Sequence, residues 1–365
     1  MTPRSFVYLA AVAALSVLLA IVSFAANNQW SAGKATGAKL LPTLADSIRQ
    51  VAEIEIRQGD TSVVLEKTGD SWGLKNRGGY PVDVAKVRTL LVSLGEAELI
   101  ETKTRRADRY AALELEEPAE KSAKSRLVRI AGAKGDVIAE VVIGKKRPEA
   151  YGTGKAGGTY VRKPGDPQSW LANVDLEPSL AVKDWAKTSV LTMDTAKISR
   201  ISIEIPGEQA LKAERPAAGA RDKGAKDDKD AKDAKTPAEP AKLGFVGFPS
   251  EGKKLKDATA AEAIARAVSS IEMEDVRKPA ASPAAGVGVV KIESADGPTT
   301  TLRLRKDGDE HWLSVIATGE GEAKKAAEEI SGRTKGWEFK VPALKAESIL
   351  KKRADLLEAP AAEKK

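Results

Sequence analysis

The sequence predicts an α+β fold, in which an N-terminal transmembrane helix precedes two tandem, similar β-β-β-α-β units, each with an added hairpin and mixed or antiparallel sheets. Three observations predict it. Residues 6–26 carry no charge, apolar and charged residues alternate in the segments that follow, and the same pattern returns in the second half of the 365-residue chain. About 320 residues follow the apolar segment and a short stalk, which is enough for two domains of ordinary size.

The segment from Phe6 to Ala26 is long enough to cross a membrane. Roughly 20 apolar residues rising about 1.5 Å each cover the hydrocarbon core of about 30 Å, whereas the apolar part of a cleavable signal runs only about 7 to 15 residues. We therefore expect an anchor. Removal remains the alternative, because Ser23-Phe24-Ala25 places small residues at the spacing that a signal peptidase reads.

Arg4 lies on the short N-terminal flank, and positive charge near a span tends to stay in the cytoplasm. We expect residues 1–5 inside the cell, residues 27–47 as a stalk outside it, and the rest of the chain, up to a short tail at 359–365, on the outer side. The sequence thus predicts a single-pass protein of the cytoplasmic membrane with its bulk exported.

The first unit is expected at residues 48–193. Apolar and charged residues alternate from Val51 to Ile56, and apolar runs follow at Val63–Leu65 and Trp72–Leu74, with glycines between them. This pattern predicts three antiparallel strands joined by turns.

A helix is expected after the third strand. Asp83 stands at its N-cap, and Val87, Leu91 and Leu94 recur at helical spacing before Leu99-Ile100 resumes as a strand. A short additional helix from Asp108 to Leu115, ended by Pro118, is predicted in this half and not in the other.

The second unit, residues 194–358, repeats the first. Ile201 and Ile203 match Ile54 and Ile56 at an offset of 147 residues, and the helix matches at an offset of 177. The offsets differ by 30 residues, the length of an Ala, Lys, Asp and Pro run at 213–242 that we expect to be a disordered insertion. The helix positions that match are Ile264, Val268, Ile271 and Val276 with Val87, Leu91, Leu94 and Leu99.

The repeat continues into the hairpins that follow. At an offset of 162 residues, Val128, Ile130 and Gly135 correspond to Val290, Ile292 and Gly297. Chance register between two generic αβ segments is the alternative to a true duplication.

Composition excludes several classes of function. The net charge is +7, but 59 basic residues are interleaved with 52 acidic ones and aromatic residues make up only 4% of the chain, which argues against a nucleic-acid surface. Cysteine is absent, so disulfides, thiolate metal sites and cysteine nucleophiles are excluded.

A serine hydrolase is a distant alternative. Gly69-Asp70-Ser71-Trp72-Gly73 satisfies G-x-S-x-G, but a nucleophile elbow needs a helix after the serine, and here the pattern predicts another strand. The single histidine, His311, lies in a predicted hairpin strand of the other half. We expect Ser71 to lie in a turn that presents Trp72 to the core.

Motifs for phosphate and metal are incomplete. Gly152-Thr-Gly154-Lys155 lacks the remaining P-loop residues, Gly286-Val-Gly288 lacks its third glycine, and Asp307-Gly-Asp309-Glu310 reads as a hairpin turn. We therefore predict no cofactor and no metal.

One cationic segment, from Lys145 to Lys163, is kept as a candidate anion site, because its cations surround glycines in a predicted flexible connection. A solvated hairpin loop is the alternative. The candidate residues are Lys145, Lys146, Arg147, Lys155, Arg162 and Lys163.

Five residues are expected to be structural: Trp72 and Trp185 as core residues, Tyr80 and Pro81 in a turn, and Asp83 as the helix cap. Trp170, Trp312 and Trp337 are also expected in the core.

The first unit resembles the domain of unknown function 4340 family over roughly Leu40 to Leu191. The residues that carry the resemblance are Trp72-Gly-Leu, Gly79-Tyr80-Pro81-Val82-Asp83, Lys86-Val87-Arg88, Glu101-Thr102-Lys103-Thr104 and Tyr110-Ala-Ala-Leu113-Glu-Leu115-Glu-Glu-Pro118. Glu114 departs from the family's Leu-Gly-Leu-Glu-Asp signature, in which a glycine is commoner. The resemblance implies a bacterial membrane-tethered protein accessory to an ABC-type transport system, and it brings no catalytic residues.

The sequence thus predicts a non-enzymatic, membrane-tethered extracytoplasmic protein that binds other envelope proteins such as transporter subunits. A binding module for an anionic envelope polymer or lipid, acting through the Lys145–Lys163 segment, is the alternative from another class.

Overall fold

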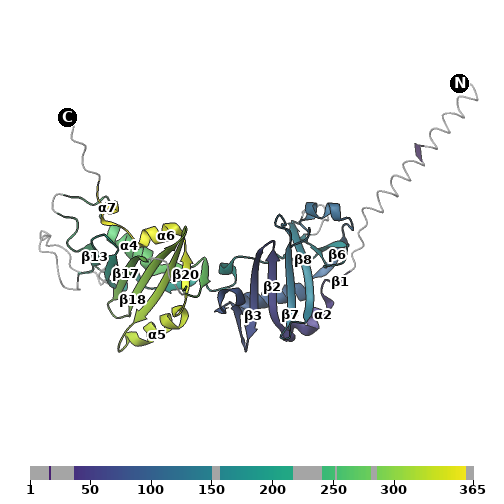
Figure 1. Ribbon diagram of the computed structural model, residues 1–365, viewed down its shortest axis with the longest axis horizontal. Coiled ribbons are helices and arrows are strands. Elements are labelled where there is room, and N and C mark those ends of the chain that lie inside the picture. The colour runs from purple at the N-terminus through teal and green to yellow at the C-terminus, as the bar shows by residue number, and fades with distance from the viewer. Residues whose placement is uncertain are drawn as a thin grey trace, which may run out of the picture. The chain divides into compact units, whose positions relative to one another are not determined.

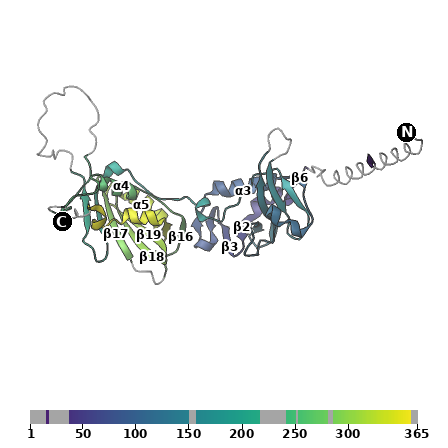
Figure 2. The same ribbon diagram turned by 90° about the horizontal axis from the view of Figure 1, so that it is seen from above.

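The computed structural model describes residues 16–17, 37–149, 157–216, 241–250, 253–280 and 286–358, which fall into two compact units. Unit 1 ends at Leu180 and omits Asn76–Val82. Unit 2 consists of Asn76–Val82 and the chain from Ala181 onward. Figures 1 and 2 show the elements of each unit from two directions.

Unit 1 is built on one antiparallel sheet in the order β1-β6-β10-β9-β8-β7-β2-β3-β4. Helix α2 contacts both α3 and β8. The elements are β1 (Ala38–Lys39), α2 (Pro42–Ser47), β2 (Val51–Gln58), β3 (Thr61–Thr68), β4 (Ser71–Leu74), α3 (Val84–Glu96), β6 (Glu98–Thr102), β7 (Arg126–Gly132), β8 (Val137–Arg147), β9 (Gly158–Arg162) and β10 (Ser169–Ala172), with 3-10 turns at η1 (Ile48–Gln50), η3 (Ala107–Arg109) and η4 (Ala111–Leu113).

Unit 2 is built on a second antiparallel sheet in the order β14-β13-β12-β17-β18-β19-β20-β16, beside a separate pair formed by β11 and β15. Helix α5 lies along β19 (Figure 2). The elements are β5 (Tyr80–Pro81), β11 (Ser189–Thr192), β12 (Ile198–Glu204), β13 (Leu211–Glu214), β14 (Gly244–Phe245), α4 (Ala260–Ser269), β15 (Ser270–Glu272), β16 (Asp275–Arg277), β17 (Gly286–Ser294), β18 (Thr299–Asp307), β19 (Glu310–Thr318), α5 (Ala323–Thr334), β20 (Glu338–Val341), α6 (Ala343–Ile349) and α7 (Arg353–Leu356). Two 3-10 turns, η5 (Val182–Asp184) and η6 (Thr195–Lys197), lie near the start of the second half, and η2 (Lys75–Arg77) precedes β5.

The two sheets share one strand order. Eight strands of unit 1, in the order β6-β10-β9-β8-β7-β2-β3-β4, match β16-β20-β19-β18-β17-β12-β13-β14 of unit 2. Strand β1, beside β6, has no counterpart in unit 2. The registers agree as well. Ile54 faces Ile130 where β2 pairs with β7, and Ile201 faces Ile292 where β12 pairs with β17. The offsets of 147 and 162 residues seen in the sequence therefore relate residues in equivalent positions.

The central strands alternate between buried and more exposed residues. In β2 the burial follows the alternation of the sequence, so that Ile54 and Ile56 are fully buried while Glu55 between them stays partly exposed. Helix α3 buries Val87, Leu91 and Leu94 and begins at Asp83, whose Oδ1 accepts a hydrogen bond from the backbone N–H of Ala85 at 3.0 Å. The three predicted strands, the helix and its cap are confirmed.

A short segment of the first half belongs to unit 2. The guanidinium of Arg77 donates two hydrogen bonds to Asp275, at 2.7 and 2.9 Å, and Val82 pairs with Ala186 in an isolated bridge. The ring of Tyr80 meets Trp337 and Phe339 edge to face, with centroids 5.0 and 6.0 Å apart.

The predicted boundary at 193/194 is therefore wrong, since the division falls between Leu180 and Ala181. The residues just after Leu180 pack within unit 2: β11 pairs with β15, and Trp185 is 5% exposed. Within the second helix, Ile271 does not correspond to Leu94, because α4 ends at Ser269 and Ile271 lies in β15. Pro81 lies in β5 after a turn at Gly78-Gly79, and not in the turn itself.

The predicted helix from Asp108 to Leu115 is replaced by the two turns η3 and η4. Glu114 follows η4 in the left-handed region, at φ 56°, and is the one non-glycine residue with positive φ among the described residues. The chain turns there because the segment lies close over β8: a Cβ on Gly144 would come within 2.3 Å of the carbonyl oxygen of Leu113.

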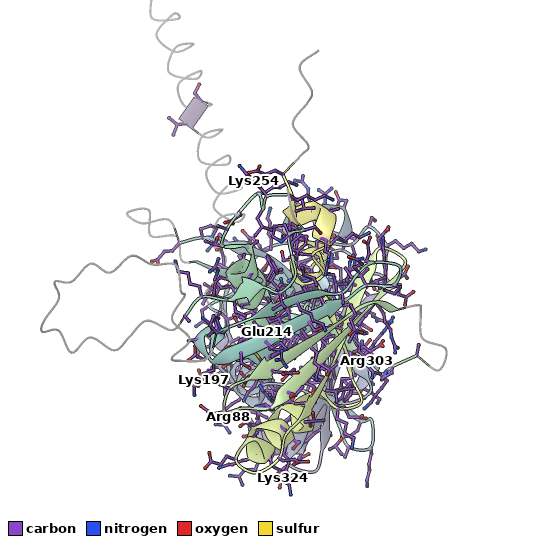
Figure 3. The ribbon with its side chains drawn as sticks, turned by 90° about the vertical axis from the view of Figure 1, so that its left-hand side faces the viewer. Arg88, Lys197, Glu214, Lys254, Arg303 and Lys324 are labelled. Carbon is purple, nitrogen blue, oxygen red and sulfur yellow. The ribbon has the colours of Figure 1, made fainter. Side chains whose placement is uncertain are left out.

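Two predicted segments fall largely outside the described residues. Of the insertion at 213–242, residues 217–240 are not described, while Ala213 and Glu214 belong to β13, so the insertion does not begin at 213. Figure 3 labels Glu214 on this strand, where it accepts a hydrogen bond from Arg200. Of the apolar segment at 6–26, only Ser16 and Val17 are described, and among described residues no helix has the length and apolar character to span a membrane.

Replacing Tyr80 with alanine should destabilise unit 2 by about 3–5 kcal/mol, because a buried aromatic ring is lost from between Trp337 and Phe339. Urea unfolding followed by circular dichroism measures the loss. Pro81→Ala is the matched control, since Pro81 is exposed. Equal stability of the Tyr80→Ala and Pro81→Ala variants would contradict the anchoring role of the ring.

Replacing Glu114 with glycine should raise the stability by about 1 kcal/mol. A non-glycine residue in the left-handed region costs about 1–3 kcal/mol of strain, which glycine removes. Glycine also stabilises the unfolded chain through its entropy, but only by about 0.4–1 kcal/mol. Lys134→Gly, at a turn residue without positive φ, should lower the melting temperature slightly and serves as control. A lower melting temperature for Glu114→Gly would show that the left-handed backbone is not strained.

Candidate functional site

Most of the cations of the predicted anion site lie on strands and not in a flexible connection. Lys145, Lys146 and Arg147 end strand β8, and Arg162 ends β9. Lys163 follows β9 and is partly exposed, and Lys155 lies outside the described residues. The two strands pair in antiparallel register, which brings Arg162 opposite Val142 and fixes the backbone that carries the cations.

Lys146 is paired with two carboxylates. Its Nζ lies 2.7 Å from Oδ1 of Asp175 and 2.9 Å from Oε2 of Glu177. The hydrogen bonds that Lys146 donates to these two carboxylates raise its pKa, and the same interaction lowers the pKa of Glu177. Lys146 therefore remains charged, and its charge is balanced within unit 1.

Arg147 shares the carboxylate of Glu101 with a lysine. Its Nη1 donates to Oε2 of Glu101 at 2.7 Å, while Lys103 donates to Oε1 of the same carboxylate. Burial alone would raise the pKa of Glu101, but the hydrogen bonds from Lys103 and Arg147 outweigh it and hold the pKa below its ordinary value of 4.5.

Arg162 has a structural role. Its side chain is 4% exposed, Nη2 donates to Oε1 of Glu117 at 2.7 Å, and the guanidinium lies 4.8 Å from the ring centroid of Tyr110. Tyr110 in turn packs with Leu115, Leu127 and Val142 in a small core on the sheet. Arg162 thus holds the segment that contains η3 and η4 against β8 and β9.

A polar hollow of about 560 Å³ adjoins these strands. Two cations, Lys146 and Arg147, and two acidic residues, Glu149 and Asp175, line it, so positive and negative charges balance there. The sequence shows the cations because they are contiguous. Their partners Glu101, Glu117 and Asp175 come from distant segments, and only pairing of the strands reveals them.

The serine and histidine considered for a hydrolase fall in different units. Ser71 begins β4, which continues through Trp72 to Leu74, and His311 lies in β19. A strand follows Ser71 where a nucleophile elbow requires a helix.

The structural residues are placed as follows. Trp72 is buried on β4, Tyr80 is buried in unit 2, Asp83 caps α3 and Trp185 is buried beside η5. Trp312 is buried as well, whereas Trp170 and Trp337 are only partly buried. Among described residues, no group of three His, Cys, Asp or Glu side chains could hold a metal ion.

The family comparison matches the residues that shape these features. A family model described as a domain of unknown function (DUF4340) matches residues 72–288, more than half of the chain. The chain belongs to this family. The DUF4340 match begins at Trp72 on β4 and ends at Gly288 on β17, so it includes Tyr80, Asp83 and the central strand β12. None of the curated proteins and none of the solved structures compared with the chain matches it.

Replacing Glu101 with glutamine should lower the stability at pH 7 by about 1 kcal/mol, because Lys103 and Arg147 lose a shared partly exposed carboxylate. The pKa of Glu101 is lower in the folded chain, so its contribution is present above about pH 4.5 and is lost as the pH falls through the folded pKa. The difference between wild type and variant should therefore shrink in acid.

Urea midpoints at pH 7 and pH 3.5 measure this change, with Glu120→Gln as control because the Glu120 side chain is exposed. A difference that is the same at both pH values would exclude a contribution from the charge of Glu101.

Proposed function

We propose that this DUF4340 protein is a non-enzymatic protein of the bacterial envelope, held on the cytoplasmic membrane by residues 6–26 with both units on the outer side. There it binds other envelope proteins as an accessory component of an ABC-type transport system. The observation that carries the proposal is the uncharged segment from Phe6 to Ala26, which is long enough to span the bilayer ahead of two folded units.

The placement of the signature residues supports a role in binding. Tyr80 packs among aromatic rings, Asp83 caps a helix, and Tyr110 and Glu117 hold the guanidinium of Arg162. These residues maintain a shape. Holding such a body at the membrane raises its effective concentration toward partners in the same bilayer, which favours complexes that would be weak in solution. The assignment to a transport system rests on the family resemblance.

Leu15→Arg combined with Leu19→Arg should release the protein from the membrane, because each arginine near the middle of a span costs about 2.5–3.5 kcal/mol of insertion free energy. Alkaline carbonate extraction followed by immunoblotting measures the partition. Leu15→Ala with Leu19→Ala is the matched control and should stay in the pellet. Release of the wild type, with a mature N-terminus beyond Ala25, would replace the anchor by a cleaved signal.

The partner role is tested by crosslinking in intact membranes, followed by affinity purification and mass spectrometry. A permease and an ATPase should be enriched with the full chain and lost when residues 1–26 are replaced by a cleavable signal. Recovery of the protein without any transporter component would count against the proposed role.

A further inference from the structure

A groove of about 460 Å³ lies in unit 2 between α4 and α6, beside α7. Figure 1 labels these three helices. The two helices are far apart in the sequence and contact each other in the folded unit. The volume is in the range of sites for small molecules, about 300–1,000 Å³. Neither the family match nor the sequence patterns assign a role to this groove.

One wall of the groove is apolar and is made of small side chains. Ala260, Ala263, Ile264 and Ala267 of α4 line it, and Leu356 of α7 closes one side. The alanines leave space between the helices, while Ile264 and Leu356 remain mostly buried beneath it, at 3% and 8% exposure. An apolar chain bound here would remove apolar surface from water.

The rim of the groove is cationic. Lys256, Arg266, Lys345 and Lys351 line it, against two lining carboxylates, those of Asp257 and Asp355.

Both carboxylates already accept hydrogen bonds. Asp257 accepts from the backbone N–H and the hydroxyl of Thr259, each at 2.7 Å, and Asp355 accepts from the backbone N–H of Lys352 at 3.3 Å. The side chain of Lys256 donates to the carbonyl oxygen of Asp355 at 3.0 Å, which leaves its charge without an opposing carboxylate there.

Lys345 and Lys351 are the half-buried cations of this rim. Within the part of the chain that the structure describes, neither has a hydrogen bond or ion pair from its ammonium group. Burial lowers the pKa of Lys345, and the attraction of Glu272 offsets this only in part. Even with Glu272 counted, four cations face three carboxylates, so an added anion would be stabilised.

We propose that this groove binds a small anionic amphiphile, with its acidic head between Lys345 and Lys351 and its alkyl part on the alanine wall of α4. The lysines complement the charge of the acidic head, and the alanine wall complements the alkyl part, within one site of small-molecule size. This site goes beyond the proposed tether and does not depend on it.

An eight-carbon carboxylate that carries a diazirine is the probe, added to the full chain in phosphatidylcholine nanodiscs and crosslinked by light. Mass spectrometry locates the labelled peptides. We expect labels in residues 260–269 and 343–356, and weaker labelling by the matched neutral amide. Unlabelled octanoate should compete with the probe.

Lys345→Met with Lys351→Met should reduce labelling about tenfold or more, because each charge-assisted hydrogen bond contributes about 1.5–3 kcal/mol. Lys324→Met with Lys325→Met on α5, where Figure 3 labels Lys324, removes the same charge elsewhere and should leave labelling unchanged. Ala263→Trp keeps every cation but fills the groove at an exposed helix position, and it should also abolish labelling.

Three results would overturn the proposal. Equal labelling by the carboxylate and the amide would exclude recognition of the charge. Labels outside the groove, or groove labels that persist in both the lysine variant and Ala263→Trp, would exclude this site. Competition by an acidic peptide but not by octanoate would make the occupant a protein segment.

Discussion

The antiparallel pairing at the middle of each sheet is the constraint on which the rest of the structure depends. In unit 1, Ile54 of β2 faces Ile130 of β7, and in unit 2, Ile201 of β12 faces Ile292 of β17. Each pair turns the apolar faces of its two strands to the same side of their sheet. A slip of one residue would turn every one of these side chains toward solvent, so burial fixes the register strongly. The helices α3 and α4 and the outer strands are added around that pairing in the same order in both units.

A second constraint joins the first half of the sequence to unit 2. The segment Asn76–Val82 leaves unit 1 after β4 and returns to it at Asp83. Tyr80 and Arg77 make its main contacts, one through aromatic rings and the other through a two-pronged hydrogen bond to Asp275. The Gly-Tyr-Pro-x-Asp motif therefore serves both units, since its tyrosine packs in one and its aspartate caps a helix in the other.

The cations of the two sites described above differ in their partners. In unit 1, Lys146, Arg147 and Arg162 are matched by carboxylates from neighbouring segments, and their charges stabilise the end of β8 and the segment over it. In unit 2, Lys345 on α6 and Lys351 just after it border the apolar wall of the groove, and neither forms an ion pair within the described residues. The paired cations of unit 1 therefore serve its own packing, whereas the rim of the groove in unit 2 keeps an excess of positive charge.

The sequence by itself determined the class of fold, the strands from Val51 to Leu74, the cap at Asp83 and the repeat, because alternation, helical spacing and capping are local signals. Its offsets also located equivalent residues of the two sheets. Only the tertiary structure decided that Tyr80 belongs to unit 2, that Arg162 is buried against Tyr110, and that α4 and α6 form a groove. These features join residues that are distant along the chain, and a local pattern shows a charge or a ring without showing the partner that folding brings to it.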